Sequence, residues 1–185
     1  MVVGLGNPGP EYDATRHNVG WWLLDRLAYE WDFPLFQREG KAMVTEGFRG
    51  HERFRLMKPM NYMNRSGQAL MALATLSEFR WDEDLLVVVD DAALDVGRVR
   101  FRSQGSPGGH NGLKSVSLAL GSDEYARLRI GVGVPPAGED LSDWVLSPMG
   151  PKDEDVILGL LPDLVQGVEV WGREGMEEAQ NGFNR

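Results

Sequence analysis

The feature that most constrains the fold is an unbroken aliphatic run at residues 85–89, which leads directly into Asp90 and Asp91. A strand with one solvent-exposed face alternates polar and apolar residues, whereas a continuous apolar run is typical of a strand covered on both faces. The run is far too short to cross a bilayer, which takes about 20 apolar residues. The sequence therefore predicts a buried strand at residues 85–90, with both aspartates emerging at its C-terminal end.

Strands and helices are expected to alternate along the rest of the chain. Residue patterns predict strands at 2–6, 41–48, 52–58, 97–103 and 127–134, with a hairpin around Gly50, and a loop at 32–40. Helical patterns cover 18–31, 66–79, 112–121 and 140–146, and a last helix starts at Pro151 and breaks at Pro162. We expect one α/β domain over residues 1–185, with a mixed, mostly parallel sheet flanked by helices.

The composition excludes several kinds of site. The chain has no cysteine, so it has neither disulfides nor cysteine metal ligands, and His17, His51 and His110 are too scattered for a zinc-binding spacing. No basic leader with an apolar segment stands at the N-terminus. We therefore expect a cytoplasmic protein that binds neither metal nor membrane.

The charge is unevenly distributed. A net charge of −9 argues against a surface that coats nucleic acid broadly, but bases outnumber acids between residues 95 and 130, and acids outnumber bases from residue 151 onward. Arg98, Arg100 and Arg102 alternate with Val99 and Phe101, which predicts a half-exposed strand with a basic face. This pattern allows local phosphate binding in an acidic protein.

The stretch from Gly4 to His17 allows two interpretations. Gly4-x-Gly6-x-x-Gly9 fits the dinucleotide-binding fingerprint, which requires a helix to open at the third glycine. Pro10 follows that glycine and a polar loop continues to about residue 15, so the helix starts too late for a dinucleotide cofactor. The alternative is a tight turn with an incidental histidine, although loops at such strand ends commonly carry binding and catalytic groups.

A second glycine-rich loop, at residues 105–111, runs into the helix that is predicted to end at Gly121. It differs from a Walker A loop because Leu113 separates Gly112 from Lys114. Its glycines would let the backbone approach a ligand closely. Asn111 could instead be the N-cap of the following helix.

Four stretches together resemble the bacterial-type peptidyl-tRNA hydrolase family. They are Gly4-Leu5-Gly6-Asn7-Pro8-Gly9 with Tyr12 and Thr15-Arg16-His17-Asn18; Lys58-Pro59 with Tyr62-Met63-Asn64-Arg65-Ser66-Gly67; Asp90-Asp91; and Gly108-Gly109-His110-Asn111-Gly112-Leu113-Lys114. Each is short, but they occur in the family's order. The resemblance implies a monomeric α/β hydrolase without metal or other cofactor. Its partner would be peptidyl-tRNA, in which it cleaves the ester joining the peptide to the tRNA 3′ end.

The resemblance also implies roles for particular residues. The catalytic histidine would be His17 and its acidic partner Asp90. Substrate binding falls on Asn7, Asn64 and Asn111, contact with the 3′-terminal nucleotide on Tyr12 and Met63, and the tRNA 5′ phosphate on Arg102 and Arg129. Two departures lie beside Asp90: Val89 stands where histidine is common, and Ala92-Ala93 replace the usual Leu-Asp.

These residue types suit ester hydrolysis. A neutral imidazole can take a proton from water and return it to the leaving ribose oxygen, while a carboxylate on its other nitrogen fixes the tautomer. Asparagine amides offer neutral donors to an oxyanion. Because the chain has no cysteine and no G-x-S-x-G elbow, a covalent acyl-enzyme is disfavoured. We expect His17 and Asp90 to meet at hydrogen-bond distance, about 2.6–3.2 Å.

Taken singly, these residues have ordinary structural alternatives. Asp90 could cap a helix, Asn7 could serve a turn, and His17 could be a satisfied loop residue. The second hypothesis for the whole chain is a non-catalytic RNA-binding module on the same fold.

Overall fold

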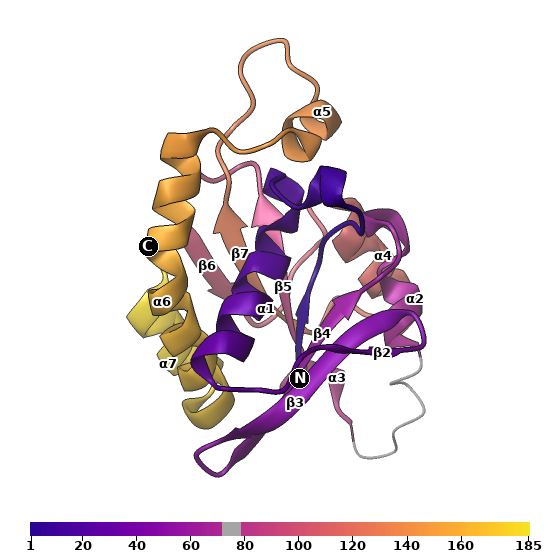
Figure 1. Cartoon of the computed structure of the whole chain (residues 1–185), viewed down its shortest axis with the longest axis vertical. Coiled ribbons are helices and arrows are strands. Elements are labelled where there is room, and N and C mark those ends of the chain that lie inside the picture. The colour runs from indigo at the N-terminus through magenta and orange to yellow at the C-terminus, as the bar shows by residue number, and fades with distance from the viewer. Residues whose placement is uncertain (72–78) are drawn as a thin grey trace.

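The computed structural model describes residues 1–71 and 79–185, and seven strands among them form one sheet (Figure 1). The strands are β1 (Val2–Gly4), β2 (Gln37–Glu39), β3 (Ala42–Arg49), β4 (Glu52–Pro59), β5 (Leu86–Asp91), β6 (Val99–Arg102) and β7 (Ala126–Gly131), in the order β2-β3-β4-β1-β5-β7-β6. The four central strands β4, β1, β5 and β7 are parallel, and β2, β3 and β6 pair antiparallel at the two edges. The predicted mixed sheet with a parallel centre is confirmed.

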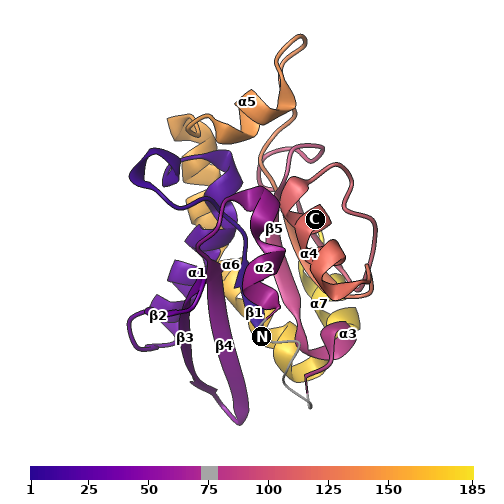
Figure 2. The same cartoon turned by 90° about the vertical axis from the view of Figure 1, so that its right-hand side faces the viewer.

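Helices cover both faces of the sheet, as Figures 1 and 2 show. The elements are α1 (Val19–Glu30), α2 (Gly67–Leu70), α3 (Trp81–Asp84), α4 (Asn111–Leu120), α5 (Leu141–Leu146), α6 (Pro151–Glu174) and α7 (Met176–Phe183), with 3-10 turns η1 (Pro10–Tyr12), η2 (Arg16–Asn18) and η3 (Met63–Arg65). Helices α1, α6 and α7 pack on one face, and α2 and α4 pack on the other.

Strand β5 lies between these two layers. Leu86 and Val88 join the core formed with α1 and α6, whereas Val87 and Val89 join the core formed with α2 and α4. All four side chains are fully buried, so the aliphatic run is covered on both faces as the sequence predicts. The run ends by carrying Asp90 to the C-terminal edge of the parallel strands.

Other predicted elements need correction. The predicted break at Pro162 is wrong: α6 continues through it, because Leu161, Leu164 and Val165 around the proline are buried in the core and hold the helix on the sheet. Residues 37–39, predicted as loop, form edge strand β2 on β3. Helix α7 follows Gly175, where a backbone φ of 105° ends α6.

Further boundaries differ from the prediction, and the strands expected at 2–6 and 127–134 end earlier, at Gly4 and Gly131. Of the helix expected at residues 66–79, the start is present as α2, while Leu73, Ala74 and Leu76 lie outside the described residues. The basic strand expected at 97–103 is shorter, and Arg98 precedes it. The hairpin of β3 and β4 is confirmed, with Arg49 opposite Glu52 beside the turn.

The loops that follow β1, β5 and β7 open at one end of the sheet, where α5 also lies (Figure 1). In open α/β sheets ligands bind outside the carboxyl ends of the strands. A binding site is therefore expected at this edge.

Candidate active site

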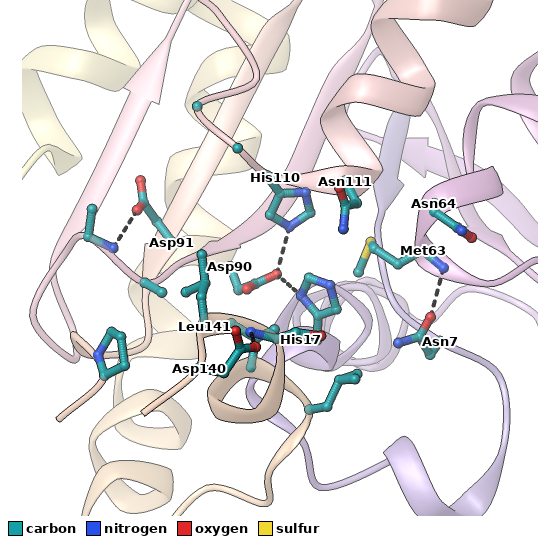
Figure 3. A pocket seen from close by; sticks show the side chains of 18 of the residues that line it. Asn7, His17, Met63, Asn64, Asp90, Asp91, His110, Asn111, Asp140 and Leu141 are labelled. Carbon is teal, nitrogen blue, oxygen red and sulfur yellow. Dashed lines mark hydrogen bonds and ion pairs between the residues drawn. The ribbon is translucent and has the colours of Figure 1, made fainter. Parts of the chain in front are cut away.

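A cavity of about 770 Å³ lies at this edge of the sheet (Figure 3). Its wall includes every site residue that the family resemblance assigns except Arg102: Asn7, Tyr12, His17, Met63, Asn64, Asp90, Asn111 and Arg129. These residues come from the loops after β1 and β4, from the end of β5, from the start of α4, and from β7. Segments far apart in the sequence thus form one lining.

His17 and Asp90 are in direct contact. The 3-10 turn η2 holds His17 with its Nδ1 2.8 Å from Asp90 Oδ1, and both side chains are buried. Because a carboxylate only accepts, Nδ1 carries the proton and Nε2 keeps its lone pair. Nε2 has no hydrogen-bond partner among the described residues. The contact predicted from the sequence is present, with the geometry of an oriented base.

His110 is a third member of this cluster that the sequence did not reveal. Its Nε2 lies 2.9 Å from the same Asp90 oxygen, and its Nδ1 accepts hydrogen bonds from the backbone N–H groups of Gly112 (3.1 Å) and Leu113 (3.2 Å). His110, and not Asn111, is therefore the N-cap of α4. The two backbone donors fix the Nε2–H tautomer, so the only lone pair on this ring is already used. Of the two imidazoles, only that of His17 offers a nitrogen to a substrate or water.

Asp90 is an acceptor for two imidazoles, not a helix cap. Complete burial would raise the pKa of its carboxyl group, but the imidazoles of His17 and His110 outweigh burial and hold the pKa well below its usual value. The carboxylate is therefore ionised at neutral pH. It can orient the His17 ring and stabilise positive charge on it.

The same three side chains also bring together atoms of the kind that bind metals. One potential ligand atom from each of His17, Asp90 and His110 lies within 4.8 Å of the other two. For His110 Nε2 to bind a metal, its proton would have to move to Nδ1, where it would face two backbone N–H donors. The donor set therefore suits a hydrogen-bonded cluster better than a metal.

Asn7 is fixed so that its amide N–H groups remain available. Its backbone N–H donates to Asn18 Oδ1 (2.8 Å), its backbone carbonyl accepts from Asn18 Nδ2 (3.0 Å), and its own Oδ1 accepts from the Met63 backbone N–H (2.7 Å). Its Nδ2 has no partner among the described residues, and Asn7 lines the cavity. Asn64 and Asn111 are exposed on the same cavity wall. Asn18, in the Thr-Arg-His-Asn motif, is a support that sequence reasoning did not assign.

An aromatic pair and a buried methionine border the asparagines. Tyr12 and Tyr62 meet edge to face with ring centroids 6.4 Å apart. Met63 is buried against Gly112, where an added Cβ would lie 2.5 Å from the methionine sulfur. Glycine at position 112 therefore allows the start of α4 to approach η3 closely.

The arginines around the glycine-rich loop differ in their surroundings. Arg129 donates to Asp91 Oδ2 (2.8 Å) and to the carbonyls of Ser106 (3.3 Å) and Pro107 (3.4 Å), whereas Arg102 is exposed at the end of β6. Arg127 is buried and donates to the backbone carbonyls of Gly105, Asp123 and Tyr125. Strand β7 thus holds the loop that carries His110 and Asn111.

Helix α5 forms another wall and is tied to the turn that carries His17. The buried Arg16 guanidinium stacks 3.5 Å over the Trp144 ring and donates to Ser147 Oγ (2.6 Å) and the Pro148 carbonyl (3.0 Å). Trp144 Nε1 donates to the Gly133 carbonyl (2.8 Å) after β7. His17 and this wall of the cavity therefore share one support.

The family model for "Peptidyl-tRNA hydrolase" matches residues 1–185. The chain belongs to the peptidyl-tRNA hydrolase family. Relatives named peptidyl-tRNA hydrolase include one from Gemmatimonas aurantiaca, 44% identical over 100% of this chain and 99% of the relative, and one from Symbiobacterium thermophilum, 45% identical over 100% and 98%. A crystal structure of peptidyl-tRNA hydrolase from Acinetobacter baumannii has a TM-score of 0.92 at 31% identity, covering 99% of this chain and 93% of that one.

The two departures from the peptidyl-tRNA hydrolase pattern have different surroundings. Val89 is fully buried in the core beneath α4, away from the cavity. Ala92 and Ala93 line the cavity beside Asp90, and Ala93 N–H donates to Asp91 Oδ1 (2.9 Å). The departure from the family pattern that reaches the cavity is therefore a pair of small side chains. Among the described residues, no helix is at once long and apolar enough to cross a membrane.

Proposed function

We propose that this chain hydrolyses the ester between a peptide, or an N-blocked amino acid, and the 3′ end of tRNA, and so recycles peptidyl-tRNA, with His17 as the general base. The observation that carries the proposal is the His17 ring, whose Nδ1 is 2.8 Å from Asp90 and whose Nε2 has no partner among the described residues. Membership of the peptidyl-tRNA hydrolase family supports the choice of substrate.

The reaction follows from this geometry. His17 Nε2 takes a proton from water as the water oxygen attacks the ester carbonyl carbon, which becomes a tetrahedral oxyanion. The carbon–oxygen bond to the ribose then breaks, and the imidazolium gives its proton to the departing 3′ oxygen. The Asp90 carboxylate orients the ring and stabilises its transient positive charge. No covalent enzyme intermediate is required.

The asparagines supply donors around the reacting carbonyl. The partnerless Nδ2 of Asn7 is fixed by Asn18 and Met63, so it can donate to the oxyanion without first being ordered. Asn64 and Asn111 lie on the same wall and would bind the peptide amides. Loss of one preorganised oxyanion donor costs about 10²–10³-fold in kcat in other hydrolases.

The remaining assigned residues would hold the tRNA. Tyr12 and Met63 would contact the 3′-terminal nucleotide, and Arg102 with Arg129 would bind the 5′ phosphate. The exposure of Arg102 supports a phosphate contact, whereas Arg129 already holds Asp91 and the glycine-rich loop. We expect the protein to act as a cytoplasmic monomer without metal or other cofactor.

The test is the release of N-acetylated amino acid from N-acetyl-aminoacyl-tRNA by the purified chain. We expect turnover that is unaffected by EDTA, because no step uses a metal. Binding of the tRNA without any release would overturn the proposal and favour the non-catalytic RNA-binding module.

A further inference from the structure

Cations are unevenly paired with acids over the part of the chain that the structure describes. Ion pairs hold the arginines of the β3–β4 hairpin and of the C-terminal helices: Arg49–Glu169, Arg53–Glu46, Arg55–Glu39, Arg173–Glu169 and Arg185–Asp163. In a chain with a net charge of −9, carboxylates are plentiful, so an exposed cation without one is informative.

Arg65 and Lys114 are two such cations. Arg65 ends the turn η3, and Lys114 lies in the first turn of α4. Both are exposed, and neither forms an ion pair with a carboxylate of the described residues. Asn61 Nδ2 donates to the Arg65 backbone carbonyl (3.2 Å), which fixes the turn beneath the guanidinium.

The backbones that carry these two cations are held together. The Gly67 backbone N–H donates to Ser115 Oγ (3.0 Å), and an added Cβ on Gly67 would lie 2.1 Å from the Ser115 carbonyl oxygen. Figure 2 shows α2 and α4 side by side. Arg65 lies two residues before Gly67 and Lys114 immediately before Ser115, so the two cations are carried on backbone segments in close contact.

This cation pair adjoins the cavity wall. Asn64 immediately precedes Arg65, and Asn111 lies one helical turn before Lys114; both asparagines line the cavity. Lys41 is a further exposed cation that reaches α2, where its Nζ donates to Gln68 Oε1 (3.0 Å). Arg102 and Arg129 lie elsewhere, on strands β6 and β7.

We propose that Arg65 and Lys114 bind the backbone phosphates of the single-stranded 3′ end of the tRNA as it leaves the cavity past Asn64 and Asn111. The inference rests on the proposed function for the identity of the RNA. A guanidinium fork and an ammonium, carried on backbone segments in close contact and without carboxylate partners among the described residues, suit phosphate oxygens and release counterions when they bind them. These contacts position the strand without reading its sequence.

The test compares the wild type with Arg65→Gln/Lys114→Gln on three esters of the same N-acetylated amino acid: full tRNA, a short 3′-end oligonucleotide, and adenosine. In the double variant, we expect kcat/KM for the oligonucleotide ester to fall about tenfold relative to kcat/KM for the adenosine ester. This fall should come from a higher KM. The slope of log affinity against log salt should become less steep by about 0.7 for each lost phosphate contact on a single strand.

A matched control removes two positive charges elsewhere. Arg38→Gln/Lys152→Gln changes an edge strand and the first turn of α6, where Asp153 and Glu154 follow Lys152. We expect this control to keep the wild-type ratio of oligonucleotide to adenosine hydrolysis. An equal loss of oligonucleotide hydrolysis in both double variants would mean that net charge alone causes the effect, and it would overturn the inference.

Direct binding separates this inference from the proposed function. Fluorescence anisotropy with the unesterified 3′ oligonucleotide requires no turnover, and we expect the Arg65→Gln/Lys114→Gln variant to bind about tenfold more weakly. Equal affinities would overturn the inference, as would losses confined to full tRNA or shared by adenosine. If the wild type binds the oligonucleotide through these residues yet releases no amino acid, the proposed function fails, but the inference that Arg65 and Lys114 bind phosphates is supported.

Discussion

Asp90 Oδ1 receives the N–H groups of both His17 and His110. An Asp90→Ala variant keeps the His17 Nε2 base and loses only its orientation and charge stabilisation. In a hydrolase triad, loss of the acid costs less than loss of the histidine, and we expect the difference here to be one to two orders of magnitude. Single-turnover hydrolysis of N-acetyl-aminoacyl-tRNA measures it, and equal losses in Asp90→Ala and His17→Ala would contradict an orienting role.

The pH dependence can also be assigned to a residue. Burial raises the pKa of Asp90, but the two imidazoles lower it below its ordinary value, so the carboxylate stays ionised between pH 5 and 8. A lowered folded pKa stabilises the fold above the unfolded value of about 3.9, and this stability is lost only as the pH falls through the lower folded pKa. Because only a neutral imidazole can take a proton from water, we expect kcat/KM to rise with pH over roughly the range in which histidine titrates. Circular dichroism should stay constant over this range, because Asp90 stays ionised. A flat rate profile would count against a histidine base.

The sequence predicted part of this cluster and missed part of it. His17 follows β1, and Asp90 lies at the end of the parallel neighbour β5, so the two residues share the carboxyl edge of the sheet and their meeting could be expected. His110 reaches Asp90 only because the glycine-rich loop turns sharply, with positive φ at Gly108 (60°) and Gly109 (89°). Sequence patterns do not specify that path, and the alternative they offered for the cap was Asn111.

At the scale of elements, Arg127 holds the glycine-rich loop on β7. Its buried guanidinium donates to the carbonyls of Gly105, Asp123 and Tyr125. Arg127→Met would leave these acceptors without a donor, and we expect a loss of about 2–4 kcal/mol in the free energy of unfolding by urea. The matched control Arg53→Met removes an exposed ion pair with Glu46 and should cost less than about 1 kcal/mol. Similar losses in both variants would contradict this role of Arg127.

Local pattern was sufficient for elements with strong periodicity or clear turn residues, such as the β3–β4 hairpin and α4, which ends at Gly121 with a φ of 67°. It failed where tertiary packing decides. Helix α6 passes through Pro162 because its apolar face is buried on both sides of the proline, and β2 exists because the edge of β3 accepts it. Neither effect is visible from the residues concerned alone.

For the whole molecule, the expected effect of charge is local. Arg102 is exposed, whereas Arg129 also holds Asp91 and the loop, so Arg102→Gln tests the tRNA 5′ phosphate without disturbing the cavity wall. We expect a higher KM and a weaker salt dependence for full tRNA, with no change for a 3′-end fragment that lacks the 5′ phosphate. A comparable loss on the fragment would place the 5′ end elsewhere.

The central claim is that His17 is the base, and a pair of histidine variants tests it most directly. His17→Ala removes the only imidazole of the cluster with an available nitrogen, whereas His51→Ala removes an exposed histidine at the hairpin turn. In single-turnover hydrolysis of N-acetyl-aminoacyl-tRNA, we expect His17→Ala to lose about 10²–10⁴-fold in rate with tRNA affinity retained, and His51→Ala to match the wild type. Near-wild-type hydrolysis by a folded His17→Ala variant would contradict the account.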